Sequence, residues 1–205
     1  MPVNTRGYQL LIGFAMLLMS IGIACNGGAA PVAQPAQQPT PVPSNSNTNN
    51  SSPAANGSAP VIFIDRNKFF QIEVPGDWKH STNSGPHAYL DQFLSPDGKA
   101  MVENITYNDG TPFKGAQNGQ FALLLIRQFH SNGKEGDLRV SEDKIMTDGT
   151  ERLTWSSNGR GFSGLSYFKV RDGVNFLMFS LESADDHQIA YLEVLNKIQA
   201  SYSTP

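Results

Sequence analysis

The stretch Val174-Asn175-Phe176-Leu177-Met178-Phe179-Ser180-Leu181 decides the fold that this sequence predicts. In an extended strand, successive side chains point to opposite faces of the sheet. One face would carry Val174, Phe176 and Met178, and the other would carry Leu177, Phe179 and Leu181. A strand that is apolar on both faces has to be covered on both. The sequence therefore predicts a central strand at 174–181, with another layer packed against each face of its sheet.

Three further strands precede this one and are joined by short turns that contain an Asx-Gly pair. The strands are expected at Leu138–Met146, Glu151–Ser156 and Phe162–Val170, and the turns at Asp148-Gly149, Asn158-Gly159 and Asp172-Gly173. Such pairs between apolar runs are the strongest short-range signal of a β-hairpin. We therefore expect an antiparallel meander from residue 138 to residue 181.

A helix is predicted on the amino-terminal side of the meander, between Gly115 and His130. Apolar residues recur there at helical spacing, at Phe121, Leu124, Leu125 and Phe129. Asn132-Gly133 would end this helix. The run 122–126, taken alone, is also compatible with a buried strand.

A second helix is expected at the carboxyl end, from Ala184 to about Tyr202. Ser183 and Asp186 form a start that is similar to a capping box. The predicted apolar stripe of this helix is Ile189, Leu192, Leu195, Ile198 and Tyr202. This stripe would pack against one face of the sheet.

The amino-terminal part of the domain holds two strand pairs. They are predicted at Val61–Ile64 with Phe69–Val74, and at Tyr89–Phe93 with Lys99–Tyr107. Together with the meander and the helices, they give a mixed α and β (α+β) fold. Its antiparallel sheet would have about six to eight strands and a helix against each face.

The segment Phe69-Phe70-Gln71-Ile72-Glu73-Val74-Pro75-Gly76-Asp77-Trp78 resembles the G-F-x-I-x-x-P-x-x-W signature near the start of PsbP-like domains, with Phe69 in place of the first glycine. The order of elements from about Phe63 to Tyr202 agrees with that family. The resemblance implies an α/β/α sandwich. It also implies a mostly non-enzymatic superfamily, whose members include extrinsic photosystem II subunits, assembly factors and bacterial lipoproteins.

Residues 1–24 have the features of a secretory signal peptide. Arg6 is followed by the apolar run 8–24 and by Cys25, the only cysteine of the chain. This arrangement resembles a lipobox, although Gly22 stands where leucine is usual. The resemblance implies that Cys25 is acylated, for example with palmitate, and anchors the protein on the extracytoplasmic side of the cell membrane. An uncleaved signal-anchor helix and a chance cysteine behind an ordinary signal remain alternatives.

Residues 25–60 are expected to form a disordered linker, because residues 26–60 hold seven of the 13 prolines and no charged residue. The remaining residues, 61–205, have the length of one domain. Without Arg6, 14 basic residues stand against 18 acidic ones. This acidic balance argues against nucleic acid as a partner.

The sequence offers no convincing catalytic motif. Residues 159–164 fit the spacing G-x-G-x-x-G, but a strand follows them instead of a phosphate-binding helix. Ser163 lacks the G-x-S-x-G spacing of a nucleophile elbow. The pair Glu142-Asp143 lies among polar residues and is expected on the surface. We therefore predict that the protein is not an enzyme, with an unrecognised active site as a minor alternative.

Asp185, Asp186 and His187 suggest a metal site, with His80 and His87 as remote ligands. However, carboxylates in the first turn of a helix are explained by the helix dipole. No two histidines have metal-ligand spacing. We therefore predict neither a dedicated metal site nor a cofactor.

The segments Lys79–His87 and Asn108–Asn118 are the longest predicted loops, and loops commonly carry binding. The aromatic residues Trp78, Tyr107, Phe113 and Trp155 could line a groove between sheet and helix, or could simply pack in the core. The function expected is that of a lipid-anchored, non-catalytic domain that binds a protein or an envelope component. A carrier of a small ligand or metal, and a photosystem-associated accessory factor, are the alternatives.

Overall fold

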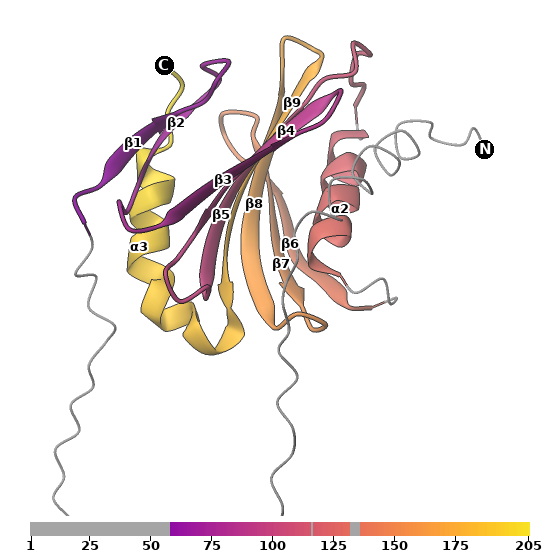
Figure 1. Cartoon of the computed structure of the whole chain (residues 1–205). Helices are drawn as coiled ribbons and strands as arrows, with labels where there is room; N and C mark the ends of the chain where they lie inside the picture. Colours follow the sequence, from indigo (N-terminus) through magenta and orange to yellow (C-terminus); the bar gives the residue numbers. More distant parts are fainter. Residues whose placement is uncertain (1–57, 116, 132–135) are drawn as a thin grey trace, which may run out of the picture.

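The computed structural model describes residues 58–115, 117–131 and 136–205 (Figure 1). The predicted signal peptide, Cys25, almost all of the predicted linker and the helix end predicted at Asn132-Gly133 lie outside these residues. Within the described ranges, no helix has the length and apolar character that a bilayer crossing requires.

A seven-stranded antiparallel sheet forms the centre of the molecule, in the order β3-β4-β5-β9-β8-β7-β6 (Figure 1). The strands are β3 (Lys79–Ser84), β4 (Ala88–Leu94), β5 (Ala100–Tyr107), β6 (Leu138–Ile145), β7 (Glu151–Ser157), β8 (Phe162–Arg171) and β9 (Asn175–Ala184). The predicted meander is present, and β9 lies in the middle of the sheet between β5 and β8. A separate two-stranded hairpin consists of β1 (Val61–Ile64) and β2 (Gln71–Val74).

The apolar side chains of β9 pack in two separate clusters. Phe176 and Met178 pack with helix α2 (Gln117–His130), whereas Phe179 and Leu181 pack with Ile198 of helix α3 (Gln188–Ser201) and with Ile72 of β2. Because neighbouring residues of a strand point in opposite directions, these clusters lie on opposite faces of the sheet. The predicted fold class, a mostly antiparallel sheet with two helices, is confirmed.

The carboxyl-terminal helix differs from the prediction at its start. Ser183 and Ala184 still belong to β9, where they pair with Ser163 and Phe162 of β8. The 3-10 turn η1 (Asp185–His187) follows, and α3 begins without a hydrogen bond from a capping side chain. The predicted capping box is therefore wrong, because the sheet extends through its first residue.

The predicted apolar stripe of this helix is also partly wrong. Ile189 and Leu192 are 92% and 59% exposed. The side chains that pack in the cluster are Tyr191, Val194, Leu195, Ile198 and Tyr202. The buried side of α3 is therefore rotated relative to the prediction, and it begins at an aromatic residue that the prediction did not include.

The predicted loop Lys79–His87 is largely a strand. All six residues of β3 pair in register with β4, so that only residues 85–87 form the turn. The stretch was not predicted as a strand because Lys-His-Ser-Thr-Asn-Ser has no apolar alternation. The other predicted loop, by contrast, has neither helix nor strand from residue 108 to residue 115.

Candidate functional site

The aromatic residues that were predicted as a possible groove pack in the core. Tyr107 and Trp155 are buried beneath α2, and Phe113 packs against Tyr107 with 6.3 Å between ring centroids. Trp78 belongs to the other apolar cluster, where its ring meets Tyr191 edge-on at 6.2 Å. These four rings therefore do not share one groove.

A depression of about 540 Å³ lies where the end of α3 meets the strands of the meander. Its lining includes Asp148, Tyr167, Lys169, Phe179 and Tyr202. Hydrogen bonds from Thr150 lower the pKa of Asp148, and burial raises the pKa of Tyr202 to about 12. Neither group is therefore tuned to exchange a proton near neutral pH, and the depression lacks the acid and base pair of a hydrolytic site.

The residues predicted as possible metal ligands do not come together. Asp186 accepts a hydrogen bond from His187 across 2.7 Å, and Asp185 accepts one from Ser163 across 2.6 Å, both at the surface. His80 instead lies 3.0 Å from Asp91 in another part of the sheet. In the described ranges, the one group of three side chains with metal-ligand proximity is Glu103, His130 and Glu182, and sequence reasoning missed it.

These three residues form what we call the buried ion cluster. His130 is the last residue of α2, and its Nδ1 lies 3.0 Å from Glu182 Oε2 while its Nε2 lies 3.4 Å from Glu103 Oε2. The side chain of His130 is 5% exposed, and those of Glu103 and Glu182 are each 1% exposed. The helix end is therefore attached to the two central strands, β5 and β9, by ion pairs that water does not reach.

The imidazole ring of His130 is held by its neighbours. It stacks on Trp155, with 4.4 Å between ring centroids, and Trp155 Nε1 donates a hydrogen bond of 2.9 Å to Ser166. The hydroxyl of Ser157 donates to the backbone carbonyl of His130. Gly164 lies beneath the indole, because an added Cβ would stand 2.7 Å from Trp155 Cζ2. A side chain at that position would displace the tryptophan against which the histidine stacks.

The charges of the cluster depend on one another. Burial alone would lower the pKa of His130, but attraction by Glu182 and Glu103 raises it to about 10. Burial raises the pKa of Glu182, although attraction by His130 opposes this. The imidazole of His130 therefore lies between the two carboxyl groups, one at each ring nitrogen. Both oxygens of Glu182 and Oε2 of Glu103 lack a well-aligned hydrogen bond from any described residue.

The sequence does contain a signal for this cluster. Glu103 and Glu182 are buried residues of β5 and β9, next to the apolar Val102 and Leu181. His130 follows Phe129 on the buried side of the helix. Charged groups at such positions are rarely buried unless they are paired. Their partners, however, are brought together only by the pairing of β5 with β9.

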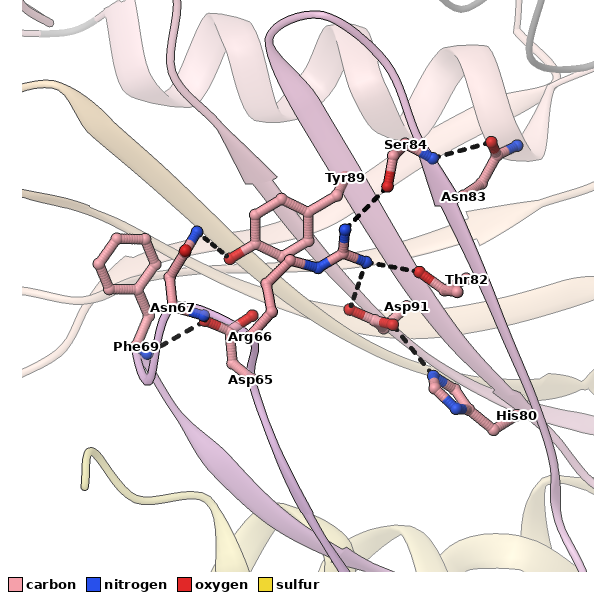
Figure 2. A network of polar contacts seen from close by, with 10 residues as sticks. All are labelled: Asp65, Arg66, Asn67, Phe69, His80, Thr82, Asn83, Ser84, Tyr89 and Asp91. Atoms are coloured by element: carbon pink, nitrogen blue, oxygen red, sulfur yellow. Dashed lines mark hydrogen bonds and ion pairs between the residues drawn. The ribbon is translucent and has the colours of Figure 1, made fainter.

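A second polar group, the edge network, lies on the opposite face of the sheet beside β3 (Figure 2). It consists of Arg66, His80, Thr82, Ser84, Tyr89 and Asp91. The guanidinium of Arg66 donates to Thr82 and Ser84 across 2.6 and 2.9 Å. It also lies 4.2 Å from the ring centroid of Tyr89. The side chains of Arg66 and His80 are 42% and 40% exposed, whereas that of Asp91 is 3% exposed.

The turn between β1 and β2 positions Arg66 over this strand. Asp65 is buried, and its Oδ2 accepts hydrogen bonds from the backbone N–H groups of Asn67 and Phe69 at 3.0 and 3.1 Å (Figure 2). Lys68 adopts a positive φ of 56° within the same turn. These contacts fix the loop so that its arginine extends across β3 toward β4.

The two edges of the seven-stranded sheet differ. β6 has a bulge between Val140 and Glu142, and its exposed side chains include Arg139, Asp143 and Lys144. Bulges and mixed charges are features that prevent another strand from pairing with an edge. β3 has neither a bulge nor a proline, and no described strand pairs with its outer side. β3 is therefore the edge that an additional strand can join.

Comparison with known proteins gives a fold neighbour. No family model matches the chain, and no curated protein is similar to it at a significant level. The solution structure of cyanobacterial PsbP (CyanoP) from Synechocystis sp. PCC 6803 matches with a TM-score of 0.53 and 12% sequence identity. The match covers 71% of this chain and 92% of that one. The domain therefore has a PsbP-like fold, which confirms the predicted resemblance at the level of the fold.

Proposed function

We propose that this chain is a membrane-anchored, extracytoplasmic lipoprotein whose PsbP-like α/β/α domain binds a protein partner and does not catalyse a reaction. The observation that carries the binding role is the open edge at β3, with Arg66 and His80 exposed beside it. An extended segment of a partner would add to this edge as a further strand. Main-chain hydrogen bonds would then supply affinity, and side-chain contacts would supply specificity.

The charge at this edge favours an acidic partner segment. The exposed side chains on β3 and in the adjacent turns include Arg66, Lys68, Lys79 and His80. The two acids nearest to Arg66, Asp65 in its turn and Asp91 in the edge network, are each 2% exposed and therefore face inward. Asp77 is the exposed acid that precedes the strand. Complementary charges of this kind increase the association rate and select among partners.

The anchor is proposed from the amino-terminal sequence, namely Arg6, the apolar run 8–24 and Cys25. Mass spectrometry of the protein extracted from cell membranes tests it. We expect the mature chain to begin at Cys25 with attached acyl chains. Recovery of the chain in the cytosol, or of an unmodified cysteine, would remove this part of the proposal.

Strand addition is tested with a synthetic peptide of alternating glutamate and valine, titrated into the ¹⁵N-labelled protein from residue 25 onward. We expect amide signals of β3 to shift. The peptide should bind more weakly at about 0.5 M salt, because salt screens the attraction between exposed charges. The matched control is the same peptide with lysine in place of glutamate. Shifts confined to β6, or none with either peptide, would count against the edge as the binding site.

Proline substitutions separate strand addition from side-chain binding. Backbone N–H groups of adjacent residues in an edge strand point in opposite directions, so one of Ser81 and Thr82 directs its N–H away from β4. Of the variants Ser81→Pro and Thr82→Pro, we expect the one that keeps the wild-type melting temperature to lose peptide binding. If that variant binds normally, the backbone of β3 is not used.

The photosystem-associated role that the resemblance implies is a second candidate, but no particular residue of this chain supports it. A role as a metal carrier is supported by a specific observation, the buried ion cluster.

A further inference from the structure

We propose that the buried ion cluster binds a divalent metal ion, Zn²⁺ or Mn²⁺, through Nδ1 of His130 and the carboxylate of Glu182. Glu103 would orient the histidine from its other ring nitrogen. This site is independent of the partner surface at β3, which lies on the opposite face of the sheet.

The spacing of the donor atoms fits one ion. Metal bonds to imidazole nitrogen and carboxylate oxygen are about 2.0–2.2 Å long, so two ligand atoms of one ion lie about 3.0–3.4 Å apart. His130 Nδ1 and Glu182 Oε2 are separated by 3.0 Å. An ion bound to both atoms would lie beside the line that joins them and would replace their direct contact.

The lack of hydrogen-bond donors points to a ligand. Glu182 is 1% exposed, its Oε1 has no hydrogen-bond partner among the described residues, and its Oε2 lies 3.0 Å from His130 Nδ1. Buried polar atoms normally have such partners, and exceptions call for an explanation such as an ion. An ion that binds both oxygens of Glu182 would supply the missing interaction.

The contacts around Glu103 match the outer part of a metal site. Glu103 Oε2 lies 3.4 Å from His130 Nε2, and Gln92 Nε2 donates a hydrogen bond of 2.6 Å to Glu103 Oε1. A metal-binding histidine usually donates its other N–H to a carboxylate, which fixes the tautomer and the ring orientation. Here the stacking of the ring on Trp155 adds a second restraint.

The charge of the cluster also favours a divalent cation. With neutral imidazole, the two carboxylates carry two negative charges, which one divalent ion would balance. Arg160 interacts electrostatically with Glu182 and offsets part of this charge. Imidazole and carboxylate ligands suit zinc and manganese, whereas the domain has no cysteine that would favour a softer metal.

The test uses the protein from residue 25 onward, stripped of metal and titrated with ZnCl₂ and MnCl₂ by calorimetry and thermal unfolding. We expect one ion per chain and a rise in melting temperature of about 5 °C at 100 times the dissociation constant. Glu182→Gln should abolish binding, and Glu103→Gln should weaken it about 10- to 100-fold. The control, Asp186→Asn with His187→Ala, removes the exposed surface group and should bind as the wild type does.

The absence of binding by the wild type with both ions at 1 mM would overturn the proposal. Loss of binding in the Asp186 and His187 control, with Glu182→Gln unaffected, would assign the ion to the surface and would also overturn it. If Glu182→Gln does not fold, Co²⁺ is added to the wild type and the ring signals of His130 are followed by NMR. Strong paramagnetic shifts of those signals support the site, and unchanged signals contradict it.

Discussion

The buried ion cluster and the edge network both pair a histidine with carboxylate groups, but they differ in their access to water. The side chain of His130 is 5% exposed, whereas that of His80 is 40% exposed. Breaking a fully buried pair leaves an uncompensated charge in the interior, whereas in the edge network water reaches the basic partners of the buried Asp91. The comparison indicates that disruption of the first cluster costs more stability than disruption of the second, whose basic groups are accessible to solvent.

The largest effect is expected from His130→Ala. The substitution leaves Glu103 and Glu182 buried without their common cation, which should lower the free energy of unfolding by about 3–5 kcal/mol. Urea denaturation measures the loss. His80→Ala is the matched variant in the edge network and should cost less, on the order of 1–2 kcal/mol, because the buried Asp91 keeps its contact with Arg66. Equal losses in the two variants would refute the distinction between the clusters.

A large effect is also expected from alkaline pH. The pKa of His130 in the folded protein, about 10, lies above the ordinary value of 6.5. A histidine whose pKa is raised by folding contributes its full stabilisation below about pH 6.5. This contribution is lost as the pH rises toward 10. Urea unfolding at pH 7 and pH 9.5 should show a loss on the order of 3 kcal/mol.

The variant His80→Ala is the comparison for this experiment, and it should show the same pH dependence as the wild type. His130→Asn, in contrast, should lose most of that dependence. If His130→Asn and the wild type respond equally to pH, the titrating group lies elsewhere.

A smaller effect is expected from Gly164→Ala, which tests the support of the buried ion cluster. The new Cβ would stand 2.7 Å from both the carbonyl oxygen of Leu181 and Cζ2 of Trp155. Overpacking of this kind costs about 1–3 kcal/mol. Thermal unfolding measures the cost, and near-ultraviolet circular dichroism reports the displaced indole. Gly85→Ala, where an added Cβ would meet only the carbonyl oxygen of Ala88 at 3.9 Å, is the control without overpacking.

The smallest effect on stability is expected from Arg66→Gln. Its guanidinium is 42% exposed and lies 3.8 Å from Asp91 Oδ2, so its loss should change the free energy of unfolding by no more than about 1 kcal/mol. Binding of an acidic peptide at β3 should nevertheless weaken clearly. Titrating the same peptide into both proteins provides this measurement. A variant with reduced stability and unchanged peptide binding would reverse the roles assigned to the two clusters.

Much of the fold could be predicted because its signals are local. The apolar run 174–181 and the three Asx-Gly turns identified β9 and the meander. β3 was missed because its side chains are polar and mostly exposed; Thr82, for example, accepts a hydrogen bond from the guanidinium of Arg66. The buried face of α3 was misplaced because Tyr191, which packs against Trp78, is an amphipathic residue that the apolar pattern omitted.

The candidate sites could not be predicted, because each depends on contacts between distant parts of the chain. Glu103 and Glu182 come from different halves of the domain and meet through the register in which Met101 lies opposite Glu182. Arg66 reaches β3 from a turn that a hydrogen bond to Asp65 holds in place. A sequence pattern can mark such charged residues as unusual, but their partners follow from the topology.

The hairpin of β1 and β2 determines how a pulling force would enter the domain. β2 is attached to the chain end by two hydrogen bonds between Gln71 and Ser203, and β1 pairs with β2 alone. Val61 and Val74 lie opposite each other at the open end of this hairpin. Tension applied from the amino-terminal side would therefore act first on the pair Val61 and Val74, and the packing of Phe63 against Phe93 would pass part of the load to the seven-stranded sheet.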